Sequence, residues 1–513
     1  MRQSARRTLV FAALCAAPLA AQPSLDQRVQ QVMDRPEFVH AMWGIEFYDL
    51  GAKRTIFAVN SDRLFVPGST TKLLTTGTAL ELLGRDHRFH TRVYRTGPVS
   101  KGTLNGDLVL VASGDPNLSG RVNTDGTLAF TNIDHSYGGL PLDADPLAVL
   151  RGLAKQVAAK GIQKVRGRVI VDASLFPEGE KELGTRVTIS PMVLNDNVID
   201  VVVIPGARAG DSATVKVLPQ TAHLSVENHL VTADSGAPPM VRAIEDSTNR
   251  DFRVLKLSGR IPRAAAPQNM RWAVPVPSRF AELSFVLMLN EAGVLASARP
   301  GKDIIDFRSL AARHADSTLI AEHVSAPFSE EAKVILKMSQ NLHASMLPMV
   351  VAATVAPGDS TKTGFDLERD VLEKGGLDVN GAVQGDGAGG DAFFSPAFMT
   401  RYLEYCTTRP WADVFRRSLP VLGKDGTLAT IQSQSPAAGQ VFAKTGTFAS
   451  YDPLHRRLLV HAKGLAGYFT SKNGRQIAFA VYVNNFALEK GDPTTFAGQA
   501  LGEIAAIGWE FIP

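Results

Sequence analysis

The chain has 513 residues, 45% of them apolar and 20% charged, an ordinary globular composition that excludes a disordered, collagenous or coiled-coil protein. This length exceeds what one hydrophobic core usually serves, so we expect two or three domains. The 54 basic and 50 acidic residues nearly balance, which argues against nucleic acid as a partner.

Residues 1–21 have the pattern of a signal peptide. Arg2, Arg6 and Arg7 precede an apolar run over 9–17, and small residues at 20–21 suit cleavage. A buried N-terminal helix would not need three arginines ahead of it. We therefore expect an exported protein, periplasmic or secreted, that is soluble or peripherally membrane-associated. No later stretch approaches the length of an integral membrane segment.

After the leader, the sequence predicts a helix over 25–33 and a β-hairpin from strands at 43–48 and 55–59. Pro67-Gly68 then precedes a helix whose apolar residues recur at helical spacing until Gly84.

From 88 to 271 the pattern changes to many short strand-like runs between Gly, Pro and Asn/Asp turns, interrupted by one helix near 146–160. We interpret this stretch as an inserted β-rich region of two small domains. Helices follow at 278–293, 330–346 and 395–407.

Two alternating apolar runs, 464–470 and 476–483, close the chain and are joined through Asn473-Gly474, a strong hairpin signal. Strands thus lie at both ends with helices between them. This order predicts an α+β domain, an antiparallel sheet flanked by helices, built from 22–87 and 272–513 and interrupted by 88–271.

Ser69-Thr70-Thr71-Lys72 opens the helix after Gly68 and contains the only Ser-x-x-Lys of the chain. A spacing of three places hydroxyl and amine on one helix face. A neutral lysine can take the proton of a serine, and the helix N-terminus supplies positive potential where an oxyanion would form. Taken alone, the motif also fits an N-cap serine with a surface lysine.

Ser339-Gln340-Asn341 is the candidate second element. Ser-x-Asn also occurs at Ser247 and at Ser471, but these lie in a polar turn and in the terminal hairpin. Ser339 instead lies in an apolar helical stretch, where side chains can point into a cleft.

Lys444-Thr445-Gly446-Thr447 is the third element. It continues a strand-like run close in sequence to the final hairpin, whereas the Lys-Thr-Gly at Lys362 lies in a loop. A strand at a cleft edge can present lysine and hydroxyls to a carboxylate, and Gly446 leaves room for a substrate backbone.

Other chemistry has weak support. Residues 385–390 match Gly-x-Gly-x-x-Gly, but a proline at 396 and the absence of a preceding buried strand favour a Gly-rich loop over a dinucleotide site. His-Glu-x-x-His and paired Cys-x-x-Cys motifs are absent from the sequence, so we expect neither a metal nor an organic cofactor.

The ordered trio Ser-x-x-Lys, Ser-x-Asn and Lys-Thr-Gly is the signature of penicillin-binding proteins and β-lactamases. The chain resembles the class C low-molecular-mass penicillin-binding proteins, the D-alanyl-D-alanine carboxypeptidase/endopeptidase family. That family also carries extra domains after its Ser-x-x-Lys helix. The resemblance extends over most of the chain and includes Ser113-Gly114-Asp115-Pro116, Asp386-Gly387-Ala388-Gly389, the segment 419–428 and Leu465-Ala466-Gly467-Tyr468.

The resemblance implies a β-lactamase/transpeptidase-like fold and an acyl-enzyme on Ser69, with Lys72 as base and Ser339 as proton relay. It implies that Asn341, Lys444, Thr445, Gly446 and Thr447 bind substrate. The implied partners are peptidoglycan stem peptides, with β-lactam antibiotics as covalent inhibitors. A serine β-lactamase or esterase of the same superfamily, and an inactive cell-wall-binding protein, remain the alternatives.

Three departures from the family pattern are visible. Gln340 stands where aspartate is frequent, at a position whose side chain we expect to matter less than its neighbours. Ala388 replaces a serine. The segment 448–464 is longer than the family leads us to expect, and we predict a loop there, beside the cleft.

Overall fold

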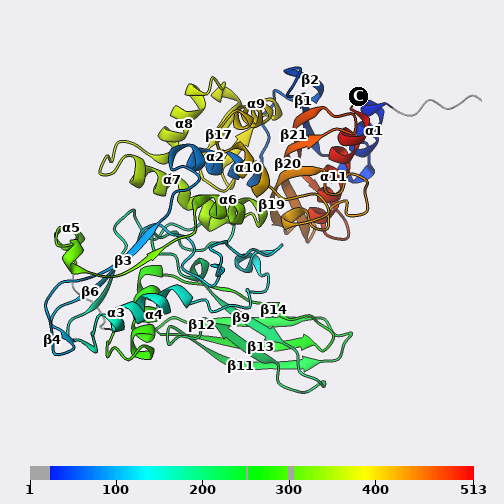
Figure 1. Cartoon of the computed structure of the whole chain (residues 1–513). Coiled ribbons are helices and arrows are strands. Elements are labelled where there is room, and N and C mark those ends of the chain that lie inside the picture. The colour runs from blue at the N-terminus through cyan, green and yellow to red at the C-terminus, as the bar shows by residue number, and fades with distance from the viewer. Residues whose placement is uncertain (1–23, 250–251, 299–304, 513) are drawn as a thin grey trace, which may run out of the picture.

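The computed structural model describes residues 24–249, 252–298 and 305–512, which form two parts (Figure 1). The chain leaves the first part near residue 88 and returns near residue 325, where the backbone N–H of Ser325 donates to the carbonyl of Phe89 at 3.0 Å. We call 24–87 with 325–512 the split domain, and 88–324 the inserted region. The predicted leader, 1–21, lies outside the described residues.

The split domain contains an antiparallel sheet with the strand order β19-β20-β21-β1-β2, and β22 pairs with β20. Ile45 of the first strand lies opposite Val481, so the two ends of the chain meet in one sheet. Helices α1 (Leu25–Met33) and α11 (Pro493–Phe511) share one hydrophobic core with this sheet. The strands are β1 (Met42–Asp49), β2 (Arg54–Val59), β19 (Val441–Asp452), β20 (Arg457–Thr470), β21 (Gln476–Asn484) and β22 (Phe486–Ala487).

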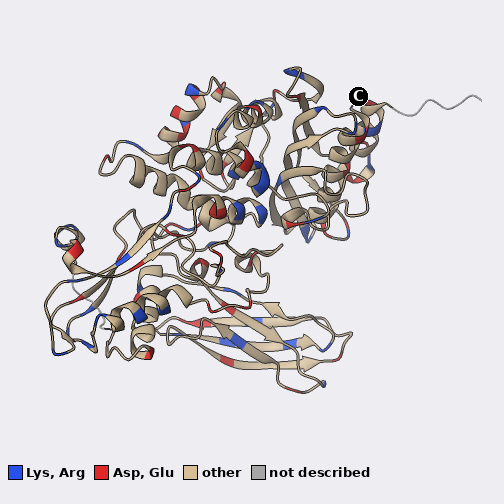
Figure 2. Cartoon of the chain, in the orientation of Figure 1, with Lys and Arg blue, Asp and Glu red and all other residues tan. Residues whose placement is uncertain are grey.

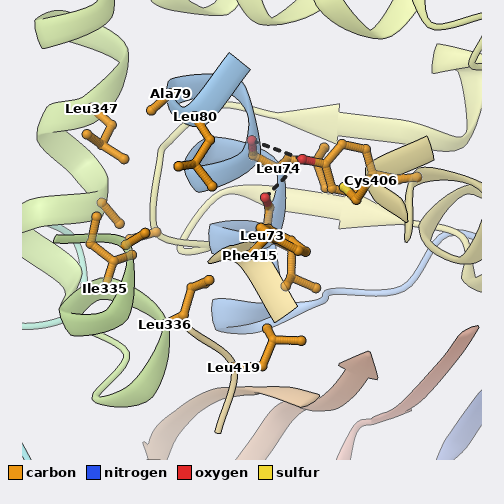
Figure 3. Close-up of a cluster of buried hydrophobic side chains, with 14 of the residues drawn as sticks. Leu73, Leu74, Ala79, Leu80, Ile335, Leu336, Leu347, Cys406, Phe415 and Leu419 are labelled. Atoms are coloured by element: carbon orange, nitrogen blue, oxygen red, sulfur yellow. Dashed lines mark hydrogen bonds between the residues drawn. The ribbon is translucent and has the colours of Figure 1, made fainter. Parts of the chain in front are cut away.

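The other helices of the split domain surround α2 (Lys72–Leu82), as Figure 3 shows for its leucines. Leu73, Leu74 and Leu80 are buried, and the hydroxyl of Tyr402 donates to the carbonyl of Leu73 at 3.0 Å. This packing fixes the start of α2. The neighbours are α6 (Phe328–Lys337), α7 (Asn341–Val355), α8 (Gly364–Lys374), α9 (Pro396–Thr407) and α10 (Ala412–Ser418), with the short hairpin β17 (Ala382–Gln384) and β18 (Ala392–Phe394).

The inserted region begins with a sheet in the order β16-β3-β6-β8, in which β6 and β8 are parallel. Helices α3 (Ala148–Ala159) and α4 (Pro277–Glu291) share its hydrophobic core. The strands are β3 (His90–Arg95), β6 (Leu108–Val111), β8 (Val169–Asp172) and β16 (Leu319–Val324), beside the short β4 (Val99–Ser100), β5 (Thr103–Leu104), β7 (Lys164–Val165) and α5 (Phe307–Ala311).

Two further sheets lie at the far end of the inserted region (Figure 1). Their leucines and valines belong to the same buried cluster as those of the first sheet, so one continuous core runs through the region. One sheet has β9 (Val198–Ile204) between β10 (Thr214–Leu218) and the short β14 (Gln268–Asn269) and β15 (Trp272–Ala273), and the other contains β11 (Leu224–Ala233), β13 (Arg253–Pro262) and β12 (Met240–Asp246).

The α+β fold with a β-rich insertion is confirmed, but the insertion extends further than we expected from the sequence. The predicted boundary at 271 assigns α4 to the split domain. Instead, Phe280 and Phe285 of α4 are buried in the core of the inserted region, and the chain returns only after β16 has paired with β3. Apolar periodicity identifies a helix without saying which core it enters.

The predicted loop at 448–464 is also wrong. Strands β19 and β20 continue their pairing to Asp452 and Arg457, so the extra residues form a long hairpin. Basic and acidic residues are interspersed over both parts of the molecule (Figure 2). Among the described residues, no helix combines the length and apolarity needed to cross a membrane.

Candidate active site

Ser69 lies in a 3-10 turn, Gly68–Thr71, that runs directly into α2. The ammonium nitrogen of Lys72 lies 2.7 Å from the Ser69 hydroxyl, and Lys72 is fully buried. Gly68 has a φ of +53°, and a Cβ there would approach the backbone nitrogen of Thr447 to 2.6 Å. Only glycine therefore lets the turn lie this close to β19.

Ser339 lies in a break between two helices, not inside the single helix predicted over 330–346. Helix α6 ends at Lys337, Ser339 has a φ of +65°, and α7 begins at Asn341. The side-chain oxygen of Gln340 accepts from the backbone N–H of Leu342 at 2.8 Å and so caps α7. The break turns Ser339 and Asn341 toward Lys72, whose nitrogen is 3.4 Å from the Ser339 hydroxyl and 2.6 Å from the Asn341 amide oxygen.

The side chain of Lys444 extends from β19 toward Ser339. Its ammonium nitrogen donates to the Ser339 hydroxyl at 2.8 Å and to the carbonyl of Thr445 at 2.7 Å. A Cβ on Gly446 would lie 2.1 Å from the carbonyl of Pro67, so a glycine is required where the strand passes the serine turn.

A cavity of about 790 Å³ opens over these elements. Ser69, Ser339, Asn341, Thr445 and Thr447 line the cavity. The two lysines lie behind the hydroxyls as fully buried groups. The structure thus brings together all the residues that the three motifs supply, and presents nucleophilic and hydrogen-bonding groups on one wall.

Both buried lysines lie in surroundings that favour the neutral amine. Burial lowers the pKa of Lys72 to about 7, although the carboxylates of Glu182 and Asp386 oppose this shift. Burial, followed by the charge of Lys72, holds the pKa of Lys444 well below its usual range. An unprotonated amine is therefore accessible near neutral pH, as a general base requires.

Other residues of the site carry no motif that the sequence would reveal. The Asn341 amide nitrogen donates to Glu182, a residue of the inserted region, at 2.8 Å. The Tyr137 hydroxyl, also from the inserted region, donates to the Ser339 carbonyl at 2.6 Å. Thr427 hydrogen-bonds Thr445, and Lys463 donates to the Thr447 hydroxyl. Thr427 falls within the segment 419–428 that resembles the family, and Lys463 falls within the segment 448–464 that we expected beside the cleft.

The competing motifs lie elsewhere. Lys362 pairs with Asp370 at the surface, and Thr363 caps α8. Ser247 lies in an exposed turn of the inserted region. The Gly-rich stretch 385–390 is a loop, as expected, whose backbone N–H groups donate to the Asp386 carboxylate. The carbonyl of Ala388 in this loop accepts from Lys72 at 3.2 Å.

Gln340 contributes more than we expected from the sequence. Its amide nitrogen donates at 3.0 Å to Asp134, within a buried network of charged groups that joins the two parts of the molecule. We call this set the acid–histidine network. Its members are Arg121, Asp134, His135, Asp196, Asp200, Glu331 and His343.

Three members of the network, Asp134, His135 and Asp196, have oxygen and nitrogen atoms within 4.8 Å of one another, a spacing that a metal ion could bridge. Their hydrogen bonds argue for ion pairing instead. Burial alone would lower the pKa of His135, but hydrogen bonds to Asp196 and Asp200 and the charges of Asp196 and Asp134 raise it to about 10. Arg121 donates to both Asp134 and Asp196, so these two carboxylates already have a cationic partner.

The fold and this site define a serine hydrolase in which a buried lysine, not a histidine, is positioned to activate the nucleophile. Comparison with known proteins then narrows the class. The chain belongs to the D-Ala-D-Ala carboxypeptidase 3 (S13) family, whose profile matches residues 25–504. It is therefore a serine peptidase.

Two curated relatives match most of the chain. The D-alanyl-D-alanine carboxypeptidase of Actinomadura sp. (strain R39) is 27% identical over 498 residues, covering 92% of this chain and 83% of the relative. The D-alanyl-D-alanine carboxypeptidase DacB of Haemophilus influenzae is 23% identical and covers 86% and 84%. The crystal structure of penicillin binding protein 4 (dacB) from H. influenzae superposes with a TM-score of 0.70 at 21% identity, covering 93% and 98%, which shows a shared fold.

Proposed function

We propose that the enzyme acts on peptidoglycan stem peptides through an acyl-enzyme on Ser69. It removes the terminal D-alanine as a carboxypeptidase, cleaves cross-links as an endopeptidase, or does both. The observation that carries this proposal is the 2.7 Å contact between the Ser69 hydroxyl and Lys72, whose pKa is lowered to about 7. We assign the reaction to the split domain, with the inserted region closing one side of the pocket.

In the acylation step, neutral Lys72 accepts the proton of Ser69 while the serine oxygen attacks the carbonyl carbon of the penultimate D-alanine. Backbone N–H groups of Ser69 and Thr447 stabilise the resulting oxyanion. Ser339, which contacts both lysines, passes a proton to the leaving amine as the C–N bond breaks. Asn341 orients Lys72 and the substrate amide relative to each other.

Residues of β19 recognise the leaving residue. Lys444 lies behind Thr445 and Thr447, whose hydroxyls line the cavity and can donate to the terminal carboxylate. The negative charge of that carboxylate favours the protonated form of Lys444 once substrate is bound. Gly446 leaves the strand edge open to the substrate backbone. Water then attacks the acyl-enzyme carbonyl, releasing the shortened peptide and returning the proton to Ser69. β-Lactams present a similar amide and carboxylate, so they acylate the same serine.

We also propose that residues 1–21 direct export and are removed, which places the mature enzyme in the compartment that holds peptidoglycan, either soluble or peripherally attached. N-terminal sequencing of the secreted or periplasmic protein tests this. A mature N-terminus near Gln22 supports the proposal, and an intact Met1 in the cytoplasmic fraction contradicts it.

The central experiment is intact-mass spectrometry after incubation with benzylpenicillin, together with D-alanine release from a peptide ending in D-Ala-D-Ala. We expect one covalent adduct and released D-alanine for the parent and for Ser247→Ala, and neither for Ser69→Ala. Labelling that persists in Ser69→Ala contradicts the assignment. Rapid penicillin turnover without a lasting adduct favours a β-lactamase instead.

A further inference from the structure

The turn at 182–187 of the inserted region reaches into the active site although no sequence motif marks it. Glu182 is almost fully buried, and its carboxylate accepts hydrogen bonds from the backbone N–H groups of Gly184 and Thr185, from the Thr185 hydroxyl and from the amide nitrogen of Asn341. A buried carboxylate with four donors is held in one orientation. The contact with Asn341 is therefore a fixed feature of the site.

Asn341 has two different partners, one at each end of its amide. Its oxygen accepts from Lys72 at 2.6 Å, and its nitrogen donates to Glu182 at 2.8 Å. Because the two ends have opposite hydrogen-bonding character, a rotation of the amide by 180° would turn its donors toward the ammonium donor and its acceptor toward a carboxylate. Glu182 thus selects the orientation in which the oxygen faces Lys72.

The close packing of Gly184, in the same turn, also restricts the Asn341 amide. A Cβ on Gly184 would lie 2.5 Å from the Asn341 amide nitrogen and 3.2 Å from a carboxylate oxygen of Glu182. The turn therefore encloses the amide closely enough to exclude any side chain at position 184. The carbonyl of Thr185 accepts from Arg271 at 2.9 Å, which anchors the turn to the rest of the inserted region.

We propose that Glu182 is a positioning residue for the acylation reaction, which holds the Asn341 amide so that its oxygen, and through it Lys72, stays aligned with Ser69. This inference rests on the proposed function and extends it, since it makes the inserted region part of the machinery that prepares the nucleophile. Glu182 touches neither the serine nor the substrate cavity wall formed by Ser69 and Thr447, so it acts through Asn341.

The charge of Glu182 adds a second signature. The charged groups that face Lys72 are Glu182 from the inserted region, Asp386 from the Gly-rich loop and Lys444 from β19. Both carboxylates raise the pKa of Lys72 against the effect of burial. Removing the charge of Glu182 therefore lowers the pKa of Lys72 further, and the neutral base persists to lower pH.

The test is the rate of benzylpenicillin acylation as a function of pH in full-length Glu182→Gln, with thermal melting as the check on folding. We expect the plateau above pH 8 to fall by about 10- to 100-fold, because Asn341 loses its fixed orientation. We also expect the acidic limb of the profile to move to lower pH. Glu180→Gln, the same change at an exposed residue two positions away, should match the parent in both.

Two further variants separate contact from charge. Glu182→Asp keeps the charge but withdraws it from Asn341, and Gly184→Ala disturbs the amide from the backbone side. Both should lower the plateau and leave the acidic limb near that of the parent. They also carry the test where Glu182→Gln melts too low to assay.

The inference is overturned if, in Glu182→Gln, the plateau rate stays within twofold of the parent and the acidic limb stays at the parental pH. Where that variant cannot be assayed, an unchanged plateau rate in both Glu182→Asp and Gly184→Ala overturns it. A lower plateau with an unmoved limb in Glu182→Gln also overturns it, because Glu182 would then support only the fold of its turn. Stoichiometric acylation of the parent is measured first. Its failure would count against the proposed function itself, and not against Glu182 alone.

Discussion

Two buried polar clusters lie on either side of Ser339-Gln340-Asn341, and they differ in how charge is compensated. On one side, Lys72 and Lys444 are buried with mostly neutral partners, and burial lowers both pKa values. On the other side lies the acid–histidine network, where carboxylates surround each cation. There burial is outweighed by ion pairing, and the pKa of His343 rises to about 10 through the charges of Glu331 and Asp196.

The difference separates a reactive site from a structural one. Groups that are buried without full compensation are ready to exchange protons, which is what acid–base chemistry needs. Groups that are buried with full compensation are locked in their charged forms and hold two parts of a molecule together. Burial of titratable residues alone does not distinguish the two cases, but the direction of the pKa shift does.

The largest effect is expected on the lysine side. Lys72→Met removes the base while keeping an apolar stem of similar length, so acylation by benzylpenicillin should slow by about 10³- to 10⁴-fold. Melting temperature should change little, because the variant buries no charge. Lys362→Met, at the exposed Lys-Thr-Gly, serves as control and should react at the parental rate. A slow rate that is shared by both variants would argue against a special role for Lys72.

The network should respond to charge removal with a loss of stability. Asp196→Asn leaves Arg121, His135 and His343 without their shared carboxylate, which should cost about 3–5 kcal/mol of unfolding free energy. Urea denaturation measures this. Asp413→Asn, at an exposed ion pair with Arg85, should leave the midpoint almost unchanged. If Asp196→Asn unfolds with the same free energy as the parent, the acid–histidine network does not stabilise the fold.

The pH profile of acylation comes next in size. Since Lys72 must be neutral and has a pKa of about 7, the rate should fall about tenfold per pH unit below 7 and level off above it. Rates measured by stopped flow between pH 5 and 9 test this. A profile that is flat through pH 6 would place the base elsewhere.

The last expected effect is on the pH dependence of stability. The folded-state pKa of His343, about 10, exceeds its unfolded value of about 6.5, so its contribution is complete below pH 6.5 and is lost as pH rises toward 10. The stability difference between parent and His343→Gln should therefore narrow between pH 6.5 and 10. The slope is at most about 1.4 kcal/mol per pH unit for one proton. A difference that widens over this range would contradict the assigned charge.

Much of the site was predictable because each motif acts locally. Ser69 and Lys72 are one helical turn apart, and Lys444 to Thr447 continue a strand, so spacing and local context placed these side chains. The antiparallel sheet followed from the hairpins at both ends of the chain. The geometry of Ser339 was missed because apolar periodicity continues through α6 and α7 and does not reveal a left-handed residue between them.

What could not be predicted depends on contacts between distant segments. Glu182 meets Asn341 across 159 positions, and Gln340 meets Asp134 across 206, with no pattern in either neighbourhood. The placement of α4 was misjudged for the same reason, since a helix of either part has the same periodicity. Pairing of β19 with β20 beyond residue 447 lacked a turn signal as clear as Asn473-Gly474.

The pairing of β1 with β21 has a consequence for the order of events during synthesis. Ile45 acquires its neighbour Val481 only after more than four hundred intervening residues have been made, and β19 with its lysine also arrives late. Contacts of such long range form slowly. A nascent chain therefore carries Ser69 and Lys72 without a pocket around them. It cannot react with a β-lactam until its last strands have been added.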